Sequence, residues 1–262
     1  MPRVSTAVRQ AFDEFTDDFD VIEAETGAWV QRLSNAQMSV KQGEARANSM
    51  RRNNVEFLVA ITLAGLSIRV RHLAEAIITL INKGNPHAAP PVARALFETC
   101  CVPIYMQGEL LPRVRKGRVE DVHKLVFRLS LGGIGIFGSP HIKPIKVDAL
   151  IRSARSELTA MVARIPGEKK FNAAELVDIY YGPLSEFTHP NWGALSMSIE
   201  LGLPPKFHAS TAFDGAIMHA VASSTAYVME AGGRAFDTVL GELSKLPMDL
   251  PDRDPLEDST PT

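Results

Sequence analysis

A long apolar segment in the first third of the chain restricts the possible folds most strongly. From about Gly43 to Lys83 the residues follow a helical pattern, and between Val55 and Leu80 they are apolar almost all round. A helix that is apolar on every side has to be surrounded by other elements. The most apolar run, Phe57 to Ile68, is too short to span a bilayer. We therefore expect a buried central helix and no membrane association.

Further helical patterns surround this segment, and no alternation of apolar and polar residues is long enough to propose a sheet. They cover residues 4–40, 92–107, 113–130, 147–163, 173–189 and 210–244. The sequence predicts an all-α protein, an elaborated antiparallel helical bundle without significant sheet, formed by a single domain at 1–245. Its core is expected to pair the helices at 47–83, 91–107, 173–189 and 210–244.

Glycine and proline residues predict where these helices end or bend. Gly84 stands where a left-handed residue ends a helix, and Pro86 follows it. The segment Glu109 to Pro112 is expected to break the chain into two helices. Pro183 is expected to kink or restart its helix because proline cannot donate a backbone hydrogen bond. Gly232-Gly233 is expected to be a flexible point in the last helix.

Composition excludes some classes of function and leaves others open. Lys+Arg 28 against Asp+Glu 30 gives a formal net charge of -2, so the chain as a whole does not have the charge of a nucleic-acid binder. The adjacent Cys100 and Cys101 cannot form an ordinary disulfide, which fits a reducing cytosol. The N-terminal sequence lacks the apolar region of a signal peptide. We expect a cytoplasmic protein, with a disordered, acidic, proline-rich tail at 246–262.

One predicted helix, at 113–130, is clearly basic. Its cationic residues are Arg113, Arg115, Lys116, Arg118, Lys124 and Arg128, set against Glu120 and Asp121. A solvated helix face is one interpretation of this pattern, and contact with RNA through the 113–128 segment is the other.

The segment from Tyr180 to Trp192 is the best candidate for a site, because it combines aromatic side chains, a carboxylate, a hydroxyl and an imidazole. Tyr181, Ser185 and His189 lie on one polar stripe of its helix. Arg94 and Glu98 share a face of another apolar helix, and buried charges need partners. We therefore predict that Glu98 and His189 lie close together in a partly buried pocket between two helices. The predicted pocket consists of Glu98, His189, Arg94, Tyr181 and Ser185, and it is either a catalytic site or a cluster that locks the helices together.

Two E-x-x-H units suggest a second kind of site. In ferritin-like bundles, two such units and two further Glu residues hold a di-iron or di-manganese centre. A hairpin at Glu109 to Pro112 would bring Glu98 level with Glu120. The candidate ligands are Glu98, Glu120, His123, Glu157, Glu186 and His189.

Two separated segments carry a resemblance to a known family. Arg94 and Glu98 form an R-x-x-x-E pattern, and Tyr181 to Pro190 forms a Y-x-x-L-S-x-x-x-H-P pattern. In these segments the chain resembles a family of bacterial helical proteins of unknown function. That family is similar to the HEPN group of helical bundles, many of them defence or toxin ribonucleases with an R-x4-6-H motif on a late helix. Here His189 has no such arginine before it, and Arg118 and His123 lie on a middle helix.

The motifs therefore leave three functions open, and the sequence does not decide whether the protein is an enzyme. The resemblance implies a HEPN-like protein of a bacterial defence or toxin type that binds or cleaves RNA. The E-x-x-H units suggest a di-metal carboxylate enzyme. A bundle whose polar cluster only fixes helix packing would be a non-catalytic interaction protein. A homo-oligomer is compatible with all three.

Overall fold

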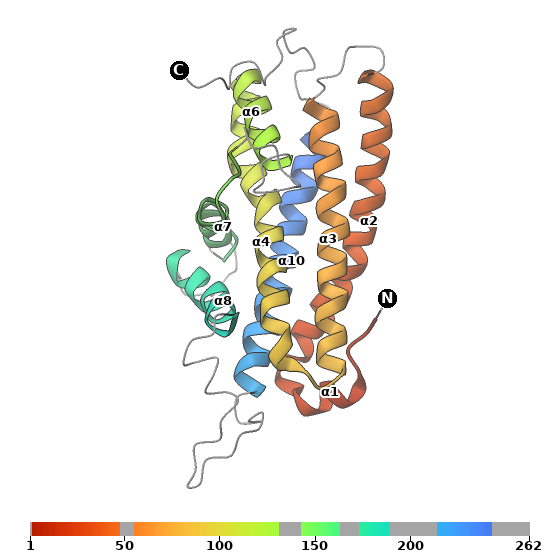
Figure 1. Ribbon diagram of the computed structural model, residues 1–262, viewed down its shortest axis with the longest axis vertical. Coiled ribbons are helices and arrows are strands. Elements are labelled where there is room, and N and C mark those ends of the chain that lie inside the picture. Colours follow the sequence, from red (N-terminus) through yellow and green to blue (C-terminus); the bar gives the residue numbers. More distant parts are fainter. Residues whose placement is uncertain (1, 48–54, 131–142, 163–172, 189–213, 243–262) are drawn as a thin grey trace.

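The computed structural model describes residues 2–47, 55–130, 143–162, 173–188 and 214–242, and every regular element in these ranges is a helix (Figure 1), as predicted. The longer helices are α2 (Thr16–Ala47), α3 (Val55–Asn82), α4 (Ala89–Tyr105), α6 (Val119–Ser130), α7 (Val147–Val162), α8 (Ala173–Thr188) and α10 (Asp214–Glu242). The shorter elements are α1 (Thr6–Ala11), η1 (Asp13–Phe15), η2 (Pro86–Ala88), the π-helical η3 (Met106–Leu110) and α5 (Leu111–Arg115). The predicted tail at 246–262 lies outside the described residues.

Four long helices, α2, α3, α4 and α10, form the centre of the bundle (Figure 1). Neighbours along the chain, α2–α3 and α3–α4, run antiparallel, whereas α10 runs parallel to α4. α4 and α10 begin at the same end of the bundle. There the ring of His87, just before α4, lies 3.1 Å from the carboxylate of Asp214, the first residue of α10. Gly84, with a φ of 67°, ends α3 as the sequence predicts.

The central position of α2 corrects the prediction that helix 173–189 belongs to the core four. The side chains of Phe19, Ile22, Trp29 and Ala36 are all fully or almost fully buried, and they share one face of α2. α8 instead packs on the outside of α4 and α10 together with α7. α2 also continues through Gly43 to Ala47, so the helix predicted from 43 to 83 is two helices.

The predicted break at Glu109–Pro112 is wrong, because the chain continues from α4 through the π-helical turn into α5. Pro112 is tolerated because it lies in the first turn of α5, where a missing backbone N–H removes no hydrogen bond. The break comes at Gly117, whose φ of 66° is the left-handed conformation that glycine adopts most easily. Each basic residue of 113–128 is therefore on α5, in this turn or on α6.

Helix α8 also runs through Pro183 without ending. Packing holds it on both sides of the proline: Leu184 is fully buried, and the Tyr180 carbonyl accepts a hydrogen bond of 2.7 Å from the Ser224 hydroxyl of α10. These contacts offset the hydrogen bond that proline cannot make.

Within the described part of the chain, α3 is the one helix long and apolar enough to cross a membrane by length and composition. The core helix of a soluble protein passes the same test, and α3 packs against α2, α4 and α6.

Candidate functional site

The predicted partnership of Arg94, Glu98 and Tyr181 is present between α4 and α8. The Tyr181 hydroxyl donates a hydrogen bond of 2.7 Å to Oε1 of Glu98, and Nε of Arg94 donates one of 3.0 Å to the same oxygen. The Arg94 guanidinium also lies 5.4 Å from the centre of the Tyr181 ring. Phe97 contacts that ring at a centroid distance of 5.4 Å. The three side chains of α4, Arg94, Phe97 and Glu98, hold the Tyr181 ring against this helix.

Burial and then the hydrogen bond to Glu98 raise the pKa of the Tyr181 phenol, so it stays a hydrogen-bond donor at neutral pH. The ion pair is partly open to solvent, with 23% of the Arg94 side chain and 27% of the Glu98 side chain exposed. The cluster is therefore partly buried between two helices, as the cost of burying unpaired charge predicts.

The structure brings three of the five predicted residues together. Ser185, one turn further along α8, is half-buried, and its hydroxyl makes no hydrogen bond within the described part of the chain. His189 lies outside the described residues, so the predicted contact between His189 and Glu98 stays a prediction.

The arrangement of the helices argues against the di-metal site. Because α4 continues into α5, Arg115 lies 17 residues beyond Glu98, which is about 25 Å of helix. Glu120, the second residue of α6, follows beyond that end. His123 on α6 is buried, and its ring packs edge-on against Phe127. Glu186 is exposed on α8. In the described residues, no three His, Cys, Asp or Glu side chains are grouped so that they could hold a metal ion. Two of the candidate ligands, the Glu157 side chain and His189, lie outside the described part of the chain.

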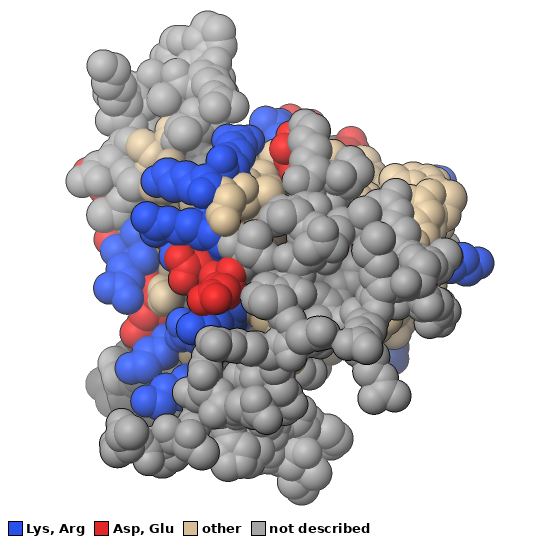
Figure 2. Space-filling view, turned by 90° about the horizontal axis from the view of Figure 1, so that it is seen from above, with Lys and Arg blue, Asp and Glu red and all other residues tan. Residues whose placement is uncertain are grey.

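A basic pocket of about 250 Å³ lies where α5, the Gly117 turn and α6 meet the end of α4. We call it the basic pocket; its lining is Tyr105, Arg113, Arg118, Asp121, Lys124, Leu125 and Arg128. Figure 2 shows lysine and arginine side chains gathered along one side of this end of the molecule, with acidic side chains among them.

The cations of the basic pocket are only partly neutralised by neighbouring acids. Arg113 pairs with Glu109 at 2.6 Å, but the Arg118 guanidinium is 3.9 Å from Asp121 and 62% exposed. Nε of Arg128 donates to the uncharged Lys143 carbonyl. Charge that is not paired inside the protein is available to an anionic ligand.

A second pocket, of about 440 Å³, adjoins the basic pocket at Tyr105. This middle pocket lies between the π-helical turn and α7, where the Gly108 position is so close to α7 that a Cβ would come within 3.2 Å of the Ser153 hydroxyl. Its lining is Tyr105, Gly108, Glu109, Ala149, Arg152, Ser153 and Ser156. The π-helical turn thus places a glycine where α4 approaches α7.

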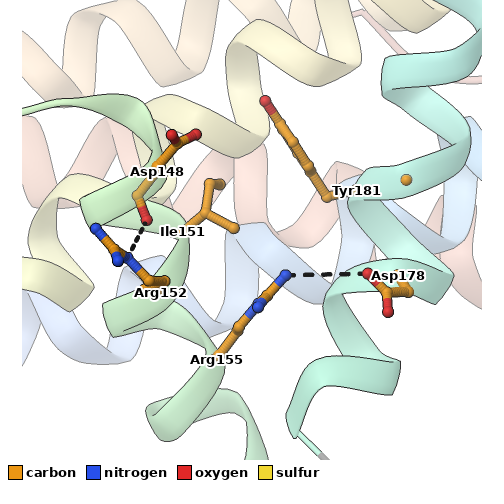
Figure 3. Close-up of a pocket in the computed structure, with 7 residues that line it drawn as sticks. Asp148, Ile151, Arg152, Arg155, Asp178 and Tyr181 are labelled. Atoms are coloured by element: carbon orange, nitrogen blue, oxygen red, sulfur yellow. Dashed lines mark hydrogen bonds and ion pairs between the residues drawn. The ribbon is translucent and has the colours of Figure 1, made fainter.

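A third pocket, of about 390 Å³, lies between α7 and α8 and shares Arg152 with the middle pocket. This α7/α8 pocket is lined by Asp148, Ile151, Arg152, Arg155, Asp178, Tyr181 and Gly182. Figure 3 shows Arg155 reaching from α7 toward Asp178 on α8, at a distance of 3.9 Å. The Arg155 Nε is shielded from solvent and has no hydrogen-bond partner among the described residues.

Tyr105 borders both the basic and the middle pocket, and Arg152 borders both the middle and the α7/α8 pocket. We call this row of adjoining pockets, which begins beside Tyr181 and ends at the basic surface of α5 and α6, the groove. Tyr181 and the basic residues were predicted from the sequence, whereas Arg152, Arg155 and Ser153 were not. Their spacing on α7 resembles that of any solvated helix face. Only the docking of α7 between α4 and α8 gives them a common pocket.

Comparison of the chain with models of known protein families, with characterised proteins and with solved structures finds no match in any of the three. The resemblance to HEPN-type bundles therefore stays an expectation, and the groove is interpreted from its own chemistry.

Proposed function

We propose that the protein binds RNA through the basic pocket and the surrounding surface of α5 and α6. The observation that carries the proposal is the charge of that pocket, where four arginine and lysine side chains surround one aspartate. Phosphate groups are the main ligands of such surfaces, and their contacts supply most of the sequence-independent affinity for nucleic acid. This local charge is set in a chain whose formal net charge is -2, so it is not a consequence of overall composition.

The groove favours a flexible single strand over a folded protein partner. It is a row of three adjoining pockets, lined mainly by polar, charged and aromatic side chains. Proteins that bind single-stranded nucleic acid combine a positively charged groove with aromatic side chains in this way. RNA cleavage stays a prediction of the family resemblance alone, because His189 lies outside the described residues.

Fluorescence anisotropy with a labelled single-stranded 12-nucleotide RNA tests the proposal. We expect binding that weakens steeply between 50 and 200 mM salt, because each phosphate contact releases counterions. The double variant Arg118→Glu/Lys124→Glu is expected to lose at least about 10-fold in affinity for the RNA. Both side chains are exposed, and an acidic residue at 118 precedes α6, where the helix dipole favours negative charge.

The matched control is Lys41→Glu/Lys83→Glu, which changes the net charge equally at exposed positions that line none of the three pockets. It should retain affinity within about twofold, since screening limits charge effects to about 10 Å. Equal weakening by both double variants, or no binding by the unmodified protein, would refute the proposal.

A further inference from the structure

The charge of the groove changes along its length. Four cations face one acid in the basic pocket. The middle pocket has one cation, Arg152, and one acid, Glu109, with the two hydroxyls of Ser153 and Ser156. In the α7/α8 pocket two arginines face two aspartates, Asp148 and Asp178. A phosphate is thus attracted to one end of the groove and meets a neutral, polar environment at the other.

The α7/α8 pocket has the groups that recognise a planar, uncharged heterocycle. Its volume of about 390 Å³ is within the usual range for small-molecule sites, and Ile151 and Tyr181 supply an apolar and an aromatic wall. The Arg155 guanidinium, on a side chain that is 38% exposed, supplies N–H donors, and the Asp178 carboxylate 3.9 Å from its Nη2 is an acceptor. Adjacent donors and acceptors match the edges of nucleobases, and single-stranded bases are bound by such edges and by aromatic side chains.

The Tyr181 ring is held in place before any ligand binds. Glu98 and Arg94 fix its hydroxyl, and Phe97 packs against its ring. A side chain already fixed in its bound conformation loses little entropy on binding. This gives the Arg94–Glu98–Tyr181 cluster a role in positioning one wall of the pocket.

We propose that the α7/α8 pocket is a nucleobase site, which takes one base of an RNA strand whose phosphates lie in the basic pocket. The inference rests on the proposed RNA binding. It adds that one end of the groove contacts a base and the other end contacts phosphates. Glu98, which holds Tyr181, and Tyr105, which borders the basic pocket, are seven residues apart on α4. That is about 10 Å of helix, or roughly three nucleotides at the ~3.4 Å spacing of stacked bases.

Two 12-nucleotide probes of equal charge separate base binding from phosphate binding: a mixed-sequence RNA and an abasic ribose-phosphate strand. The base site predicts that the unmodified protein binds the RNA about 10-fold more tightly, since contact of one base with an aromatic side chain contributes that much. The variant Gly182→Leu should abolish this preference while retaining affinity for the abasic strand.

Gly182→Leu places a side chain in the pocket, since a Cβ at position 182 meets no atom within 4 Å. Because Pro183 disfavours the helical conformation of a preceding residue that has a Cβ, the reference for stability is Gly182→Ala, which has the same Cβ, leaves the pocket open and should keep the preference for the RNA. The matched control is Gly241→Leu on α10, which is exposed, has equally open surroundings and lines none of the three pockets. This control should keep the preference for the RNA.

Each result decides between the two proposals. Equal affinity of the unmodified protein for both probes overturns the base site and leaves RNA binding intact. A preference that persists in Gly182→Leu overturns the assignment of the base to this pocket. Failure to bind either probe overturns the proposed function, and the base site with it.

Discussion

At the scale of single residues, the most informative polar group outside the groove is His123 on α6. Only 5% of this residue is exposed, and its Nε2 has no hydrogen-bond partner among the described residues. Burial lowers the pKa of the His123 imidazole below its usual value of 6.5. The folded protein therefore holds His123 neutral under conditions in which the unfolded chain already binds a proton.

Acidification below pH 6.5 should therefore destabilise the protein through His123. A depressed folded-state pKa gives stability that is present above the unfolded value and is lost as the pH falls through the folded value. We expect His123→Leu to reduce the loss of melting temperature between pH 7.5 and pH 5.0. His72→Leu, at an exposed histidine of α3, is the control and should leave that loss unchanged. The same pH dependence in both variants would show that His123 is not the group responsible.

The Arg94–Glu98–Tyr181 cluster shows which contacts between residues can be predicted from a sequence. Arg94 and Glu98 were predicted to need partners because charge on an apolar helix is costly to bury, and Tyr181 meets that need. Ser185 was grouped with them by helical spacing alone, yet its hydroxyl makes no hydrogen bond in the described part of the chain. Spacing places a residue on a face of a helix, but the contact depends on how far that face is from its neighbour.

At the scale of elements, Gly232 and Gly233 show how a residue type can be misread. The sequence suggested a flexible point, but both glycines are buried in the middle of the continuous helix α10. A Cβ at Gly232 would come within 2.8 Å of the Cys100 Cβ and 3.0 Å of its carbonyl oxygen. A Cβ at Gly233 would meet the Arg32 guanidinium, which pairs with Glu25 and Asp237. The glycines therefore allow α10 to approach α4 and α2 closely.

Gly232→Ala should destabilise the protein by about 1–3 kcal/mol, the usual cost of adding a methyl group to a packed core. The obstacle at this position is the Cys100 backbone, which can move only if α4 and α10 separate. Urea unfolding measures the change. Gly241→Ala is the control, because it is exposed with open space around it and should stabilise the helix by roughly 0.5–1 kcal/mol. Stabilisation by Gly232→Ala as well would mean that α10 is not held against α4 as described.

Most helices were predictable from their apolar periodicity, but their ends and their partners were less so. The Glu109–Pro112 break was wrong because proline is compatible with the first turn of a helix and a π-helical turn absorbs the extra residue. The sequence also predicted α8 in the core, where the structure has α2. Both helices have an apolar face, and the periodicity does not show which of two such faces the other helices cover.

At the scale of the whole molecule, the bundle has a tightly packed centre and a thinner outer layer. α10 has 16 buried residues among the described ones. The outer helices α7 and α8 contribute far fewer, namely Leu150, Ile151, Ala154 and Leu184 among their described side chains. The groove lies against this outer layer, so the candidate site is formed in part by helices that have few buried side chains among those described.

Native-state hydrogen exchange should therefore resolve two levels of stability. We expect amides of α4 and α10 to exchange only through global unfolding, and amides of α7 and α8 to exchange through a smaller opening of lower free energy. Leu184→Ala should speed exchange in α8 without a comparable effect in α10, since Leu184 is the buried side chain that anchors this helix in the described part of the chain. Equal exchange free energies in all four helices would contradict the layered description.

The same measurement connects the outer layer to the proposed ligand. A strand that spans the groove contacts α7 and α8 at one end and α5 and α6 at the other, so it binds the closed arrangement of these helices more tightly than the opened one. A saturating 12-nucleotide RNA should slow exchange in α7 and α8 by about the same factor as in α10, because the smaller opening and global unfolding both break up the site. In Gly182→Leu the RNA should still protect α6, but the protection of α8 should be lost. Slower exchange in α4 and α10 without slower exchange in α7 and α8 would show that the RNA binds a surface to which these two outer helices do not contribute.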